Sequence, residues 1–145
     1  MIVLRSDYIK GALIAYLKTV SAITSKLIDY GSTAGEIREY QWNSRDFYYP
    51  AIRVRLVRNT PDDGDCKKAI VSMSLLVFTE DQSSAKADEI SGIIATYFKG
   101  IQFSVSFLGS DYHFSLTRVT LIPAVSTGEL MWRSEVVLEG YVSQY

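Results

Sequence analysis

The chain has 145 residues, of which 48% are hydrophobic and 21% charged, and 15 Lys and Arg against 16 Asp and Glu give a formal net charge of −1. This composition suits one packed globular domain over residues 1–145 and excludes an intrinsically disordered chain. A nearly neutral chain has no general affinity for a phosphate backbone, so we expect no specific nucleic-acid binding.

The N-terminal stretch has the apolar spacing of an amphipathic helix. Large apolar residues recur at three- and four-residue steps, which predicts a helix over residues 6–30. Lys10, Lys18 and Lys26 interrupt the apolar run. We therefore expect this helix to pack on a sheet and not to enter a membrane.

Three strands are predicted in the middle of the chain, the last two joined by a polar hairpin tip. A short strand over residues 36–42 comes first, and a polar and aromatic connector follows it up to Pro50. The next strand ends near Asn59, where Pro, Asp and Gly in "TPDDGDCKK" (60–68) have the turn chemistry of a hairpin tip. Residues 69–79 form the third strand, which is apolar on both faces in places and is therefore expected to be central in its sheet.

The second half of the chain repeats this order. An apolar stripe closed by Gly100 predicts a helix over residues 84–99. Strict alternation predicts a strand over residues 101–107, and further strands cover 112–122 and 130–142, with a loop over 123–128 between them. The order helix, three strands, helix, three strands predicts an α+β fold in which two helices pack on one mainly antiparallel sheet.

Three arginines lie in and after the strand "YYPAIRVRLVRN" (48–59). Arg53 and Arg55 share the polar face of a period-two pattern, and Arg58 falls out of phase at the strand end or past a bulge. A solvated face, a nucleic-acid contact and a protein interface are the alternatives. The interface is favoured because guanidinium groups are common there and because Glu135 and Glu139 provide an acidic strand face.

Residue types that support catalysis or metal binding are few. His113 and Cys66 are the only residues of their kinds, and neither a phosphate-binding loop nor a dinucleotide-binding glycine motif occurs. An EF-hand loop that began at Asp62 would need a glutamate where Met73 stands. We therefore expect no enzyme activity, no cofactor and no metal.

The order of elements, together with four fragments, resembles a known family of virion proteins. The fragments are "ALIAYLK" (12–18), "YPAIRV" (49–54), "VFTED" (77–81) and "WRSEVVLEGYV" (132–142). In this order and spacing they resemble the tail terminator or tail completion proteins of long-tailed bacteriophages, over nearly the whole chain. The long connector "GSTAGEIREYQWNSRDF" (31–47) and the strand with three arginines depart from the family pattern.

The resemblance implies a small α+β protein that forms a hexameric ring on the head-proximal end of the tail tube. Such a ring ends tube polymerisation and presents the surface that joins the head, without catalysis. The implied partners are further copies of the chain, the tail tube protein and a head-completion or stopper protein. The implied location is the virion, assembled in the bacterial cytoplasm, with DNA passing through the ring and no membrane involved.

The resemblance also implies where contacts between proteins lie. Across a ring seam, basic residues of one subunit meet acidic residues of the next. The residues expected at this seam are Arg53, Arg55, Arg58, Glu135 and Glu139. The residues expected on loops that face the axial partners are Asp62, Asp63, Asp65, Lys67, Trp42 and Arg45.

Two other functions remain open from the sequence. One is a different virion connector, such as a head-closure or baseplate adaptor. The other is a small-molecule-binding or enzymatic α+β domain, which a deep apolar pocket with converging polar groups would favour.

Overall fold

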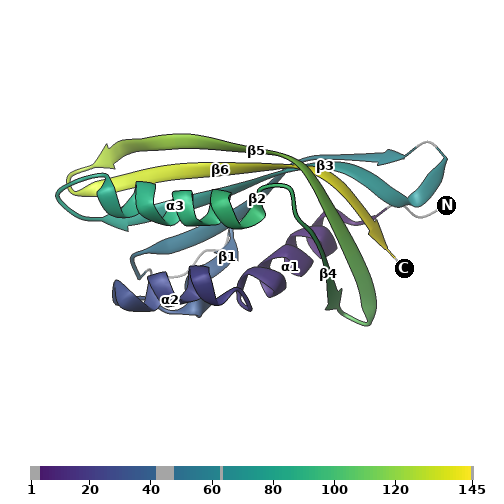
Figure 1. Cartoon of the computed structure of the whole chain (residues 1–145), viewed down its shortest axis with the longest axis horizontal. Helices are drawn as coiled ribbons and strands as arrows, with labels where there is room; N and C mark the ends of the chain where they lie inside the picture. The colour runs from purple at the N-terminus through teal and green to yellow at the C-terminus, as the bar shows by residue number, and fades with distance from the viewer. Residues whose placement is uncertain (1–3, 42–47, 63, 145) are drawn as a thin grey trace.

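In the computed structural model, which describes residues 4–41, 48–62 and 64–144, a six-stranded sheet arches over three helices (Figure 1). The strands are β1 (Ile37–Glu39), β2 (Ala51–Asp62), β3 (Asp65–Glu80), β4 (Gln102–Phe107), β5 (Ser110–Gly128) and β6 (Met131–Gln144). They lie in the order β1-β2-β3-β6-β5-β4, and all neighbours are antiparallel except β1 and β2. The predicted α+β class and the order of elements are confirmed.

The predicted first helix over residues 6–30 is two helices. α1 (Ser6–Leu17) and α2 (Ser21–Asp29) meet at a bend of 72°. Val20 is extended at the bend, and its carbonyl accepts hydrogen bonds from the backbone N–H groups that start α2. Taken singly, none of the described helices is long and apolar enough to cross a membrane; only the bent α1–α2 pair passes that test, by length and composition.

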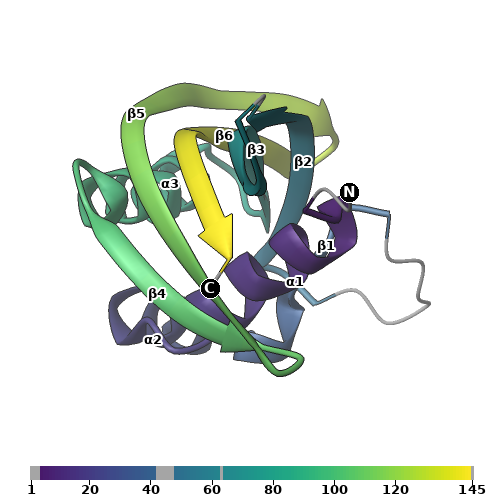
Figure 2. The same ribbon diagram turned by 90° about the vertical axis from the view of Figure 1, so that its right-hand side faces the viewer.

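All three helices lie on the concave side of the sheet (Figure 2). α3 (Ala85–Phe98) is the predicted second helix, and it packs beside an aromatic stack that joins α1 to the sheet. In this stack the ring centroid of Phe103 lies 4.0 Å from that of Tyr16 and 4.8 Å from that of Phe114. The Tyr16 and Tyr97 hydroxyls are hydrogen-bonded at 2.8 Å. The pKa of Tyr16 is raised to about 12, mainly because the hydroxyl is shielded from solvent and secondly because of this hydrogen bond.

The predicted loop over residues 123–128 is wrong, because β5 runs as a strand to Gly128. Val125 pairs with Arg133 of β6 after a register shift that begins at Ile122. β4 pairs only with the first part of β5, so Pro123 stands at an edge of the sheet, where its missing N–H breaks no ladder. A proline that normally indicates a loop is therefore accommodated in an edge strand.

A kink crosses the sheet where β2 and β5 each carry one extra residue. The extra residue is Val57 in β2 and Thr117 in β5, as the register shifts show. Gly140 of β6 lies beside the second bulge, opposite Leu116. A Cβ atom on Gly140 would lie 2.2 Å from the backbone oxygen of Ser115, so only glycine allows the two strands to approach this closely.

We expect Gly140→Ala to lower the free energy of unfolding by about 1–3 kcal/mol, because the methyl group meets backbone that cannot move without breaking the β5–β6 ladder. Urea unfolding of both proteins measures the difference. The matched control is Gly92→Ala in α3, where a Cβ atom meets nothing within 4 Å. There alanine should raise the free energy of unfolding by about 0.5–1 kcal/mol. Equal stabilities of the Gly140→Ala protein and the unsubstituted chain would contradict the role of the close approach.

Candidate functional site

The convex face of the sheet carries four of the charged residues that the sequence singled out, namely Arg55, Arg58, Glu135 and Glu139. No described helix covers this face, as Figure 2 shows. Glu135 and Glu139 of β6 lie on it, because they alternate with Val136 and Leu138, which are fully buried on the helix side. We call this convex, helix-free surface the outer face.

Arg55 and Glu135 meet on the outer face within one chain. The Arg55 Nη2 atom lies 4.0 Å from the Glu135 Oε2 atom, and the Ser74 hydroxyl donates a hydrogen bond to the same carboxylate. The Arg55 guanidinium also lies 5.3 Å from the ring centroid of Tyr40. The predicted pairing of arginine with glutamate is therefore present inside the subunit, where a half-exposed pair of this kind contributes less than about 1 kcal/mol.

A second charged row crosses the sheet at the kink. Arg58 stands opposite Ser72, Ser72 opposite Glu139, and Glu139 opposite Arg118 of β5. Arg58, Ser72 and Glu139, with Val57, line a shallow groove of about 240 Å³. Among the described residues, no ion pair within 4.0 Å joins Arg58, Glu139 or Arg118 to a partner.

The two bulges turn the arginines of this row outward. A regular period-two strand would place Arg58 on the same side as Leu56, and Arg118 on the same side as the buried Leu116. One extra residue before each arginine turns its side chain to the opposite face of the sheet. The sequence left a strand end or a bulge open for Arg58, and the structure shows the bulge. It gave no signal for Arg118, because the face on which Arg118 lies depends on the register of β5 with β6.

Arg53, which was expected at the ring seam, is buried within its own chain. Arg53 is 2% exposed, and its Nη2 atom lies 3.0 Å from the Glu36 Oε2 atom, which is in the same chain. Arg53 also donates a hydrogen bond to the Glu36 carbonyl. Glu36 ends a short 3-10 turn (Ala34–Glu36) that replaces the start of the predicted strand over residues 36–42, so Arg53 anchors β1 to β2.

The residues expected to face axial partners lie at the end of the β2–β3 hairpin and in the connector. Asp62 and Lys67 are exposed, and the Asp62 carboxylate accepts a hydrogen bond of 2.8 Å from the Gly64 N–H. Asp65 pairs with Asp62 at the start of β3. Asp63, Trp42 and Arg45 lie outside the described residues. No group of three or more potential metal-ligating residues occurs in the described part of the chain.

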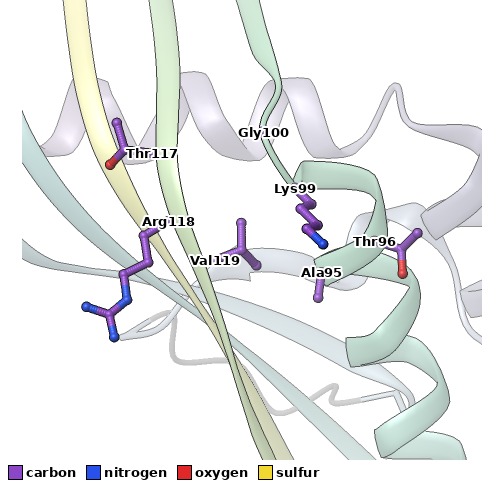
Figure 3. Close-up of a pocket in the computed structure, with 7 residues that line it drawn as sticks. All are labelled: Ala95, Thr96, Lys99, Gly100, Thr117, Arg118 and Val119. Carbon is purple, nitrogen blue, oxygen red and sulfur yellow. The ribbon is translucent and has the colours of Figure 1, made fainter.

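A surface groove with a volume of about 590 Å³ lies between α3 and β5 (Figure 3). Its lining residues are Ala95, Thr96, Lys99 and Gly100 of the last turn of α3 and its end, and Thr117, Arg118 and Val119 of β5. None of these side chains is a carboxylate, a histidine or a cysteine, so the groove offers contacts but no acid–base pair. His113 lies elsewhere, hydrogen-bonded to the Ser104 hydroxyl at 2.9 Å.

No protein-family model matches the chain, and no curated protein matches it. Among solved structures, the fold is similar to that of a chain described as "Virion of native gene transfer agent (GTA) particle". The TM-score is 0.64, the sequence identity is 12%, and the match covers 95% of this chain and 96% of the other. At this identity the likeness shows a shared fold over essentially the full length of both chains.

We expect Arg53→Met to lower the free energy of unfolding by up to about 3–5 kcal/mol, because the buried Glu36 carboxylate loses its partner at 3.0 Å and keeps only Arg38 at 3.9 Å. The control is Arg55→Met on the same face, whose side chain is 46% exposed and whose loss should cost less than about 1 kcal/mol. The double variant Arg53→Met with Glu36→Leu should recover much of the loss. Denaturant unfolding measures all three variants, and equal costs for the two single variants would contradict the anchoring role of Arg53.

Proposed function

We propose that this chain is a structural protein of a phage-like particle, in which copies of it form a ring that ends the tail tube on the side of the head. The observation that carries this proposal is the end-to-end likeness of its fold to a chain of a gene transfer agent virion. The resemblance of its four sequence fragments to tail terminator proteins narrows the proposal from virion protein to terminator. The ring acts by covering a surface, so no catalytic group is required.

The outer face supplies one side of the contact between copies. Arg58 and Glu139 lie in the same groove, so two copies that met through this groove alone would form a two-fold contact that stops at two subunits. A ring requires the outer face of one copy to meet a different surface of its neighbour. In the proposed ring, Arg58 and Glu139, which have no ion pair within the described residues, accordingly contact a surface of the next copy that is distinct from the outer face.

The β2–β3 hairpin is suited to axial contacts. Its tip projects at one end of the molecule (Figure 1) and carries the exposed Asp62 and Lys67. Exposed loop tips with few apolar residues are common binding segments. In the proposed ring, these tips contact the tail tube protein on one side or a head-completion protein on the other.

Without this protein, we expect tail tubes that exceed the normal length and carry no head, because nothing covers the growing end. Electron microscopy of particles from a deletion strain measures tube length, and purified protein added to growing tubes should restore a single length. An antibody against the chain should label the head-proximal end. Normal tube length in the deletion strain, or labelling at the baseplate end, would contradict the terminator role and favour another connector.

We expect Arg58→Glu to weaken ring formation at least tenfold while the thermal unfolding midpoint stays unchanged. Arg58 is exposed and has no ion pair within the described residues, so reversing its charge changes the outer face without disturbing the core. Native mass spectrometry over a concentration series at low salt measures assembly, since charge effects at interface rims are screened by salt. Lys18→Glu, an exposed reversal on the helix side, is the control. Unchanged assembly of the Arg58→Glu protein would show that Arg58 is not part of the contact between copies.

A further inference from the structure

The far end of the β5–β6 hairpin exposes an unusual concentration of large aliphatic side chains. Four of them fall within ten residues, and each is between 42% and 50% exposed: Leu121, Ile122, Val125 and Leu130. Glu129 is exposed in the same turn. Leu121 stands opposite Val136 and Ile122 opposite Glu135, so these two lie on opposite faces of β5 and the hairpin end exposes apolar area on both sides. Isolated exposed aliphatic residues are normal, but several at one end of a hairpin favour an interaction segment. We call these five residues the aliphatic end.

The groove between α3 and β5 has the complementary character. Ala95 and Val119 are partly buried in it, and Figure 3 shows Lys99 and Arg118 on either side of Val119. Both cations are exposed, and within the described residues neither forms an ion pair within 4.0 Å, although the strand register places Arg118 opposite Glu139. β5 also has no described strand on its outer edge here, because β4 stops pairing at Ser115. Within the described residues, an apolar floor, two cations that lack an ion pair and an open strand edge favour an extended, partly apolar segment that carries a carboxylate.

We propose that the aliphatic end of one copy docks into the α3–β5 groove of the next copy, with Glu129 between Lys99 and Arg118. This proposal rests on the ring proposed above, and it identifies two surfaces that meet at the seam between neighbouring copies. The aliphatic residues lose exposure against Ala95 and Val119, and the carboxylate neutralises the two cations.

The occupant belongs to a second copy, because the chain cannot fill its own groove. Its aliphatic end lies beside the first turn of α3, where the Ala124 N–H donates to the Asp88 carboxylate at 2.9 Å. The groove lies at the last turn of the same helix. Lys99 follows Asp88 by 11 residues, about 16 Å at 1.5 Å per residue. On the other side of the groove, Leu121 follows Val119 closely, but Glu129 comes ten residues later, beyond the end of β5, so Glu129 does not sit between Lys99 and Arg118 of its own chain. Two distinct surfaces that bind each other produce a head-to-tail contact, which closes into a ring or continues as a filament.

The test is a charge exchange read by native mass spectrometry and light scattering. The double variant Lys99→Glu with Arg118→Glu should need at least a tenfold higher protein concentration to assemble than the unsubstituted chain. Glu129→Lys alone should have the same effect. An equimolar mixture of the two proteins should recover assembly with an even number of alternating copies, because the acidic groove of one protein meets the substituted lysine of the other and the basic groove meets Glu129. One chain that carries all three substitutions should recover assembly as well. Lys18→Glu is the matched control for charge reversal, and unchanged thermal midpoints show that each variant is folded.

Disulfide trapping provides a second, independent test of the same contact. In a Cys66→Ser background, a Glu129→Cys protein mixed with a Lys99→Cys protein should give a mixed dimer on oxidation, whereas either protein alone should give little. An assembly that stops at two copies, or charge variants that assemble as well as the unsubstituted chain, would overturn the proposal.

The outcome also separates this seam from the proposed function. If the charge variants assemble normally and still limit tube length, the seam is wrong and the terminator role stands. If the unsubstituted chain forms rings that the charge variants lose, but has no effect on tube length, the seam is correct and the terminator role is wrong.

Discussion

The shape of the molecule depends on the kink at which β2, β6 and β5 bend together. Strands of 12 to 19 residues cannot enclose a small core while they remain flat. Val57 and Thr117 each add a residue to one strand, and such bulges bend the strand and increase its twist. Gly140 then allows β5 to pass against β6 at a distance that no side chain permits. One curled sheet can therefore cover three helices that lie on a single side of it.

The same kink decides the chemistry of the convex surface. Regular alternation would turn Arg58 and Arg118 towards the core, where an unpaired guanidinium is costly. The bulges place both arginines on the surface, on either side of Glu139 in one row. Sheet curvature and surface charge thus share one cause, and a change that removed a bulge would alter both.

The elements with strong local periodicity were predictable from the sequence, whereas features that depend on distant partners were not. α3 and β4 follow their apolar patterns closely. The break before α2 depends on Val20, which is buried and extended so that the chain can follow the curled sheet. Arg53 does point away from the apolar face of β2 as predicted, but its burial depends on Glu36, which lies 17 residues earlier in the sequence. No local sequence pattern contains that partner. Arg118 was missed for a similar reason, because its position on the convex face depends on the pairing of β5 with β6.

The distribution of paired and unpaired charges separates two kinds of surface. Arg53 and Arg55 are paired with carboxylates of their own chain, so little of their interaction energy is left for another molecule. Lys99 and Arg118 have no such carboxylate among the described residues, and they border a strand edge that β4 leaves open. Glu129 stands among exposed aliphatic residues at the other end of α3. A contact that joins these two regions would satisfy charge and apolar area together, whereas a contact between two outer faces would place arginines of both copies side by side. The balance therefore favours a seam that includes β5 over a contact between two convex faces.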